Sequence, residues 1–375
     1  KEDSNLEDIH RVKYKISIKP DILYQPHPAF AKSESGKYLY HDLNTKKLSN
    51  INVLSDFDIV GTRKLLAKDY VYQIKRMAHP RIHSPISGLM AKYILGLNEF
   101  AEKLSKVEKG NPGLSFIDLN DYELPGVRVI DDTTFEIILS QKYPQFLYWL
   151  SMSFFAPMPW EADYFYSQEG MIDKNITLDW YPVGTGPFML SENNPNLRMV
   201  LERNPNFRGE IFPTEGEKGD RELGLLDDAG EKMPFIDKAI YSLEKESIPA
   251  WNKFLQGYYD TSGIVSDSFD QAVQFNLQGD AELTDEMQEK GIRLLTAVTT
   301  STSYVGFNME DEVIGGDTER ARLLRRAISI AVDYEEYISI FANGRGKPAQ
   351  GPIPPGIFGN IQGMKGINPY VYNWE

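Results

Sequence analysis

The sequence of 375 residues contains no cysteine. This absence excludes disulfide bonds, thiolate nucleophiles and cysteine-ligated zinc sites. The sequence also lacks any run of ~20 consecutive apolar residues, the length that a membrane-spanning helix requires. With 41% apolar residues, the chain is expected to be globular, with enough material for two or three domains.

Positive charge is scarce relative to negative charge. Forty Lys and Arg residues face fifty-four Asp and Glu residues, which gives a net charge of −14 at neutral pH. Such a surface repels phosphate backbones and anionic membranes, and no stripe of basic residues alternates with aromatic ones. We therefore expect no nucleic-acid partner.

Motifs for metals and cofactors are also missing. His79 and His83 have a spacing that suits a metal, but Pro80 between them opposes the helix such a site needs. The acidic stretch 227–231 lacks the ligand pattern of a calcium loop. The glycines of 184–186 have neither the Lys-Ser/Thr of a phosphate loop nor the third glycine of a dinucleotide fold. We expect no metal and no cofactor.

Evidence for catalysis is limited to abundant carboxylates. No Gly-x-Ser-x-Gly elbow and no supported Ser-x-x-Lys motif occurs, and no catalytic residue is assigned. Pairs such as Glu244 with Glu246 are common in so acidic a chain and indicate a solvated surface. A carboxylate-dependent hydrolase on an α/β scaffold is nevertheless kept as the alternative function.

Periodicity in the first half of the chain predicts mixed strands and helices. Residues 12–19 alternate apolar and polar side chains, which is typical of a half-buried strand. Apolar residues at helical spacing from Leu66 to Met77 predict a helix that ends before Pro80. A second helix is predicted over 90–106, and a hairpin over 127–139.

The second half continues this pattern. The expected elements are a buried helix and turn within 146–160, a bent strand pair over 185–202, a surface insertion over 209–234, a strand over 235–244 with a helix after it, and a strand over 302–308. Thr318 and Asp333 are expected to cap two helices that turn their apolar faces inward, the second ending at Asn343-Gly344. The fold class is α/β.

Several segments occur in an order that resembles a known family. They are Thr62-Arg-Lys-Leu65 with Asp69-Tyr-Val-Tyr72, Val183-Gly-Thr-Gly-Pro-Phe188 running into Leu201-Glu-Arg-Asn-Pro-Asn206, the helix-like stretch 251–260, Arg325-Arg-Ala-Ile328, and Asn343-Gly-Arg-Gly346 followed by Gly351-Pro-Ile-Pro-Pro-Gly356. Together they are similar to the extracellular solute-binding proteins of family 5, the oligopeptide-binding type that serves ABC importers. The resemblance extends from about Tyr14 to Gly359.

The resemblance implies a two-lobed periplasmic-binding-protein-like architecture with mixed sheets. Residues 1–178 would form an accessory subdomain of the first lobe, 179–304 its core, and 305–375 the start of an incomplete second lobe. Family members have a strand-rich segment before the equivalent of Val12 and continue well past the equivalent of Gly359. We therefore expect this chain to be truncated at both ends, without the residues that clamp peptide termini.

The implied function is capture of an oligopeptide, or a related solute, between two hinged lobes, followed by delivery to an ABC permease. The chain would then be a monomeric receptor, periplasmic or extracellular and membrane-anchored, and not an enzyme. The candidate ligand-binding or hinge residues that remain are Gly184, Thr185, Gly186, Tyr304, Gly306 and Asn308. Packing at the hinge is the competing interpretation of these six residues.

Overall fold

The computed structural model describes residues 10–275, 281–297 and 299–361. The contacts within the chain divide it into two compact units, Lys1–Leu243 and Glu244–Glu375, here called unit 1 and unit 2. Each unit is described by itself. The division into 1–178, 179–304 and 305–375, which the family resemblance implies, stays a prediction.

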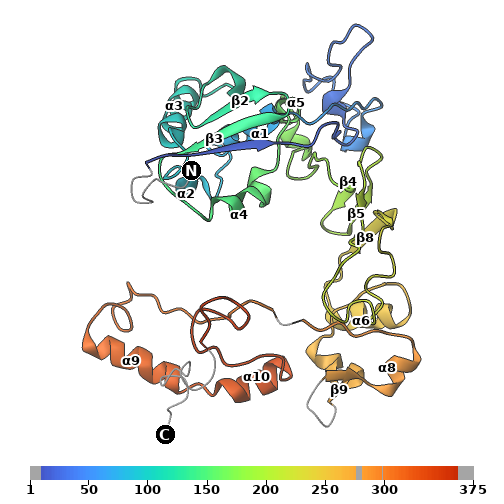
Figure 1. The fold of residues 1–375 in the computed structure, drawn as a ribbon, viewed down its shortest axis with the longest axis vertical. Coiled ribbons are helices and arrows are strands. Elements are labelled where there is room, and N and C mark those ends of the chain that lie inside the picture. The colour runs from blue at the N-terminus through green and yellow to red at the C-terminus, as the bar shows by residue number, and fades with distance from the viewer. Residues whose placement is uncertain (1–9, 276–280, 298, 362–375) are drawn as a thin grey trace. The chain divides into compact units, whose positions relative to one another are not determined.

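The elements of unit 1 can be followed in Figure 1. Its helices are α1 (Ala67–Arg76), α2 (Ser87–Met90), α3 (Leu97–Gly110), α4 (Phe146–Leu150) and α5 (Trp160–Tyr166). Its strands are β1 (Val12–Ser17), β2 (Val127–Asp131), β3 (Thr134–Leu139), β4 (Phe188–Asn194), β5 (Arg198–Arg203), β6 (Glu210–Ile211), β7 (Lys232–Met233) and β8 (Lys238–Ser242).

One antiparallel sheet, in the order β1-β3-β2, supports the first hydrophobic cluster of unit 1. β1 has the expected alternation of half-buried and exposed side chains, and its Tyr14 pairs with Ile137 at the centre of β3. Because β3 lies between two strands and under α1, it is buried almost throughout. The predicted hairpin and the first predicted helix are confirmed, and α1 ends ahead of Pro80 as expected.

The helix predicted over 90–106 is wrong in its first third. The chain leaves α2 after Met90, and Ile94 forms a bridge to Leu139 at the end of β3. Gly96 then adopts a left-handed conformation, with φ of 77°, before α3 begins at Leu97. The pairing of Ile94 with Leu139, which is distant in the sequence, therefore interrupts the single helix that local periodicity predicts.

A second cluster of unit 1 collects around α5 and the irregular segment before α1. Its fully buried side chains include Tyr24, Leu48 and Phe165. Arg63 lies between α1 and α5, with its guanidinium 2.8 Å from Asp69 Oδ2 and 2.6 Å from Glu161 Oε2. Both carboxylates are buried, so this ion network fastens the two helices together.

Unit 2 is poorer in sheet. It contains α6 (Ser247–Leu255), α7 (Phe269–Ala272), β9 (Val273–Phe275), β10 (Ala281–Leu283), α8 (Asp285–Glu289), α9 (Glu319–Ile330) and α10 (Tyr334–Ala342). The described part of its core comprises Trp251, Phe269, Ala272, Val273, Leu283 and Met287, around the β9–β10 hairpin.

The caps predicted for α9 and α10 are present, but the predicted burial of both helices is wrong. Thr318 accepts a hydrogen bond from Ala321 N, Asp333 accepts from Glu335 N and Glu336 N, and Asn343 ends α10 in a left-handed conformation. Yet Leu323 of α9 and Phe341 of α10 are 53% and 65% exposed. Neither side chain belongs to the described core of unit 2. An amphipathic sequence pattern predicts a helix, but it does not ensure that another element covers the apolar face.

Candidate functional site

The predicted residues of unit 1 lie where the chain enters β4. Gly184 is held from both sides by Gln25, a residue that is 6% exposed. The backbone N–H of Gln25 donates to Gly184 O at 2.9 Å, and Gln25 Oε1 accepts from Gly184 N at 3.0 Å. Gln25 Nε2 also donates to Pro182 O at 3.2 Å. The buried residue Gln25 thus fixes the backbone of residues 182–184 through three hydrogen bonds.

Asn204 holds the other end of the same segment. Its Nδ2 donates to Gly186 O at 2.9 Å, and its backbone N–H donates to Pro187 O at 2.9 Å. Asn206, two residues on, donates from Nδ2 to Tyr24 O at 2.8 Å. Since Asn204 is 2% exposed, its two hydrogen bonds form away from water, where an amide without partners would be costly. We call Gln25, Asn204 and Asn206 the amide clamp.

A cavity of about 610 Å³ opens beside the clamp. Its lining is mainly apolar and aromatic, and it also includes Thr185, Gly186 and the Arg208–Glu210 ion pair. The lining residues are Ile22, Leu65, Tyr70, Thr185, Gly186, Pro187, Phe188, Phe207, Arg208, Glu210, Met233, Pro234, Phe235 and Ile236. An apolar cavity of this size with a few polar groups is typical of a ligand site.

The predicted residues of unit 2 lie on an exposed segment. Tyr304 is 86% exposed, and Gly306 and Asn308 are exposed as well. The strand predicted over 302–308 is wrong, because the segment pairs with no described strand. Asn308 instead makes a turn, in which its Oδ1 accepts from Glu310 N at 3.0 Å. The six predicted residues fall in two units, and their meeting in one cleft stays a prediction.

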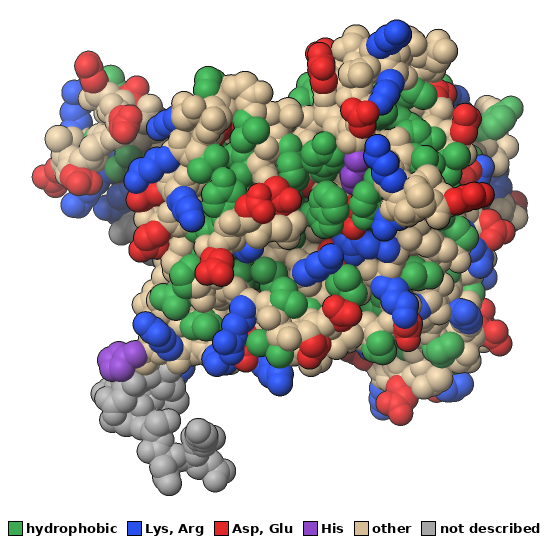
Figure 2. Space-filling view, turned by 90° about the horizontal axis from the view of Figure 1, so that it is seen from above, with side chains coloured by type: hydrophobic (Ala, Val, Ile, Leu, Met, Phe, Trp, Pro, Cys, Tyr) green, Lys and Arg blue, Asp and Glu red, His purple; other side chains and the backbone are tan. Residues whose placement is uncertain are grey.

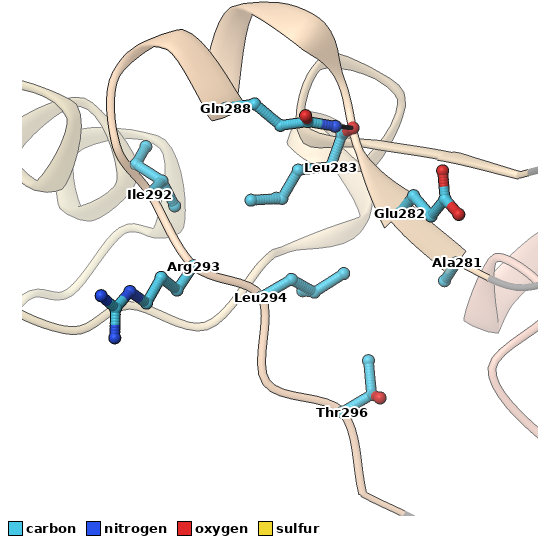
Figure 3. Close-up of a pocket in the computed structure, with 8 residues that line it drawn as sticks. All are labelled: Ala281, Glu282, Leu283, Gln288, Ile292, Arg293, Leu294 and Thr296. Atoms are coloured by element: carbon cyan, nitrogen blue, oxygen red, sulfur yellow. Dashed lines mark hydrogen bonds between the residues drawn. The ribbon is translucent and has the colours of Figure 1, made fainter. Parts of the chain in front are cut away.

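A second cavity, of about 550 Å³, lies within unit 2 (Figure 3). β10, α8 and the extended chain after α8 form it, and Gln288 Nε2 donates to Leu283 O at 2.8 Å within its lining. Arg293 contributes the one basic side chain of its lining. Since Glu282 is the only other charged lining residue, this cavity lacks the converging polar groups that a specific site needs.

The remaining candidates for metal or polyanion binding gain little support. Within the part of the chain that the structure describes, no three His, Asp or Glu side chains lie close enough to hold a metal ion. His79 Nδ1 accepts a hydrogen bond from Arg81 N, which is a local turn contact. On the face drawn in Figure 2, basic and acidic side chains are interspersed. No helix among the described residues is long and apolar enough to cross a membrane.

Sequence reasoning missed the clamp, although part of its signal was visible. Asn204-Pro-Asn206 belongs to the second quoted segment, and two asparagines around a proline indicate a hydrogen-bonded turn. Nothing local to Gln25 indicates that its partner lies 159 residues away.

Comparison with known proteins provides independent evidence about the family of this chain. The dipeptide-binding protein of Escherichia coli is 22% identical over 315 residues, covering 84% of this chain and 46% of that protein. Heme-binding protein A of Haemophilus influenzae is 24% identical over 337 residues, covering 88% and 49%. The chain spans about half the length of these relatives.

A solved structure supports the fold. The periplasmic binding protein DppA of Helicobacter pylori, in complex with the peptide STSA, superposes with a TM-score of 0.53 over 97% of this chain and 54% of that one, at 16% identity. The model of the bacterial extracellular solute-binding proteins, family 5 (middle region), matches residues 61–373. The fold of this chain is thus part of the mixed α/β, two-lobed periplasmic-binding-protein type. The chain belongs to the extracellular solute-binding proteins of family 5.

Proposed function

We propose that this chain is the ligand-capturing receptor of an ABC importer and that its ligands are oligopeptides. The observation that carries the proposal is the family match over residues 61–373. The names of relatives and neighbours add to it, since one is a dipeptide-binding protein and another was solved with a bound peptide. The cavity beside the amide clamp supplies apolar walls and hydrogen-bonding groups together.

The receptor would work by hinge closure. A ligand that touches both lobes shifts the equilibrium toward the closed form, and the closed form would be the one that a membrane permease accepts. We place the receptor outside the cytoplasmic membrane, in the periplasm or anchored at the surface, and as a monomer. It would release its ligand chemically unchanged.

The alternative of a carboxylate-dependent hydrolase receives no support from the buried acids. Asp69 and Glu161 are buried carboxylates, and both are engaged by Arg63. Burial raises the pKa of Glu161, but its hydrogen bonds and ion pair with Arg63 outweigh this and hold the pKa below the usual range. A general acid would need the opposite shift.

A thermal-shift panel tests the proposal directly. The purified chain is heated with pooled tripeptides, with a maltooligosaccharide, with hemin and with buffer alone. We expect tripeptides to raise the midpoint, because a ligand bound to the native state stabilises it by mass action. A rise with hemin alone would transfer the proposal to a different ligand class. No rise with any of the three would contradict a receptor function for this chain.

A further inference from the structure

The short helix α4, labelled in Figure 1, exposes apolar side chains to solvent. Its five residues are all apolar or aromatic. Phe146 is fully buried in the first cluster of unit 1, whereas Leu147 and Tyr148 are 57% and 75% exposed. Met152, which follows the helix, is 49% exposed. The core of unit 1 therefore uses only one side of α4.

α3 of the same unit shows the usual pattern of a helix that faces water. Its exposed side carries Glu99, Glu102 and Lys106. A helix at a protein surface normally has such a charged outer side, and a helix that is apolar all round normally lies within a core or a membrane. The exposed side of α4, which carries no charge, therefore needs a different explanation.

The segment of α4 is tied to a second segment of unit 1. Trp149 Nε1 donates to the Tyr143 hydroxyl at 2.8 Å, and the ring of Tyr143 stacks on that of Tyr93 with the centroids 4.0 Å apart. Ser140 N donates to Tyr93 O at 2.7 Å, and Ser140 Oγ donates to Lys92 O at 3.3 Å. The name α4 surface is used below for Lys92, Lys142, Leu147, Tyr148 and Met152.

The two segments that carry the α4 surface contain no carboxylate. Neither 70–98 nor 137–160 has an Asp or Glu, although the chain of 375 residues has 54 of them. Lys92 and Lys142 are exposed, and neither forms an ion pair with another residue that the structure describes. These segments are thus a local exception to the net charge of −14.

The net charge of the whole chain predicts repulsion from anionic membranes, but local charge decides at contact. At physiological salt, charges that are more than about 8 Å apart are largely screened from each other. The two lysines of the α4 surface can therefore attract an anionic surface at short range. The acidic parts of the chain are repelled by the same surface, which favours an approach through α4.

The side chains of the α4 surface suit a lipid surface better than a protein partner. Tyrosine is enriched where a membrane meets water, and apolar side chains such as Leu147 and Met152 can enter the boundary between headgroups and acyl chains. Lysine is attracted by anionic headgroups, whereas it is depleted in protein–protein interfaces. Charge and apolar exposure thus indicate the same partner.

We propose that the α4 surface docks unit 1 on a membrane surface that contains anionic lipids. Leu147, Tyr148 and Met152 enter the headgroup region, and Lys92 and Lys142 contact the lipid phosphates. The inference goes beyond ligand capture, because it gives the chain a membrane contact of its own, separate from any contact with a permease. It does not depend on which solute is bound.

Flotation with lipid vesicles tests the proposal. The purified chain is mixed with vesicles of phosphatidylcholine and phosphatidylglycerol in equal parts, or with vesicles of phosphatidylcholine alone. We expect binding to the anionic vesicles to be tighter by about tenfold or more, since each lysine near an anionic surface contributes about fivefold.

A double substitution tests the apolar side chains. Leu147→Ser combined with Tyr148→Ser should weaken binding to the anionic vesicles about tenfold, because less apolar surface leaves water. Tyr258→Ser combined with Leu295→Ser is the matched control. These two residues of unit 2 are 73% and 92% exposed, and their replacement should leave binding unchanged.

A second double substitution tests the charge. Lys92→Gln combined with Lys142→Gln should weaken binding to the anionic vesicles about tenfold or more and should not affect the neutral vesicles. Lys68→Gln combined with Lys106→Gln removes two exposed lysines of α1 and α3. This control should weaken binding less than about threefold, because screening limits the effect of charges away from the contact.

A measurement on the unaltered chain keeps the test valid if a variant folds poorly. Met152 and Met309 have nearly equal exposure, 49% and 48%. With methionine methyl groups labelled for NMR, anionic vesicles that carry a nitroxide-labelled lipid should broaden the Met152 signal more strongly than the Met309 signal.

Three results would overturn the proposal. The first is a folded chain that binds neither kind of vesicle, which would point to a protein partner for the α4 surface. The second is unchanged binding in Leu147→Ser with Tyr148→Ser, and the third is equal broadening of the two methionine signals. None of them bears on ligand capture, which the thermal-shift panel tests by itself.

Discussion

Two helices with the same kind of sequence pattern, one in each unit, differ in how deeply their apolar side chains are buried. α3 of unit 1 buries Leu97, Phe100 and Leu104, whereas α9 of unit 2 leaves Leu323 more than half exposed. Both are amphipathic and both form. The difference is the partner, because the buried side chains of α3 belong to the first hydrophobic cluster of unit 1, whereas Leu323 belongs to no described cluster. A periodic pattern therefore predicts that a helix exists, and burial depends on what the rest of the fold brings to it.

The units also differ in how they use charge. Unit 1 places the Arg63 network between two helices, where the side chains of Asp69 and Glu161 are 1% and 3% exposed. The ion pair of α8 in unit 2, Lys290 with Glu286, is largely exposed on one helix surface. The Arg63 network joins segments that are distant along the chain, whereas the α8 pair stabilises a local one.

Removing the central cation should have the largest effect. Arg63→Ala leaves two buried carboxylates without their partner, and we expect a loss of about 3 to 5 kcal/mol in the free energy of unfolding of unit 1. Lys290→Ala, the exposed counterpart in unit 2, should cost no more than about 0.5 kcal/mol. Urea titrations followed by hydrogen exchange, which reports each unit separately, would measure both. Similar losses for the two variants would refute the contrast.

The same substitution at Leu104 of α3 and at Leu323 of α9 tests the comparison directly. Leu104→Ala creates a cavity in the first cluster and should lower the stability of unit 1 by about 3 kcal/mol. The same change at Leu323 removes a side chain that is already half in water and should lower the stability of unit 2 by less than about 1 kcal/mol. An equal cost at Leu323 would mean that something outside the described residues covers α9.

Acid should affect the two units unequally. All five histidines lie in unit 1, and His27 is fully buried, with Nε2 2.8 Å from the Tyr166 hydroxyl. Burial lowers the pKa of His27 to about 3. The folded state therefore binds fewer protons than the unfolded state below pH 6.5, so stability is present above that pH and is lost as pH falls toward 3.

The expected size of this loss is about 2 kcal/mol between pH 7 and pH 5. His27→Gln should flatten the dependence over that range, which lies above the titration of ordinary carboxylates. His83→Gln, at an exposed histidine, is the control. Unfolding midpoints in urea at pH 7, 6 and 5 give the measurement, and an unchanged slope in His27→Gln would exclude His27 as its cause.

Local signals in the sequence predicted much of the fold. The alternation of β1, the end of α1 before Pro80 and the caps at Thr318 and Asp333 each depend on neighbouring residues, and each is confirmed. The errors occur where a distant contact decides. Ile94 leaves the helix to pair with Leu139, and residues 302–308 lack a described strand to pair with.

The candidate site shows the same limit. Its glycines were visible in Val183-Gly-Thr-Gly-Pro-Phe188, and Thr185 and Gly186 do line a cavity. Their role as ligand-binding or hinge residues stays a prediction. Gln25 was not visible at all, because a single glutamine carries no pattern and its hydrogen bonds are to backbone atoms 157 and 159 residues away.

That separation has a consequence for the order of folding. A loop of more than 150 residues must close before Gln25 can reach Gly184, and the entropy of closure is lost before the hydrogen bonds are gained. The β2–β3 hairpin and α1 need no such closure. The second hydrophobic cluster joins Tyr24 to Tyr181 and Val183 across the same loop, so the clamp is expected to form late in unit 1, together with that cluster. Until that moment a nascent chain would lack both the second cluster and the fixed segment 184–186.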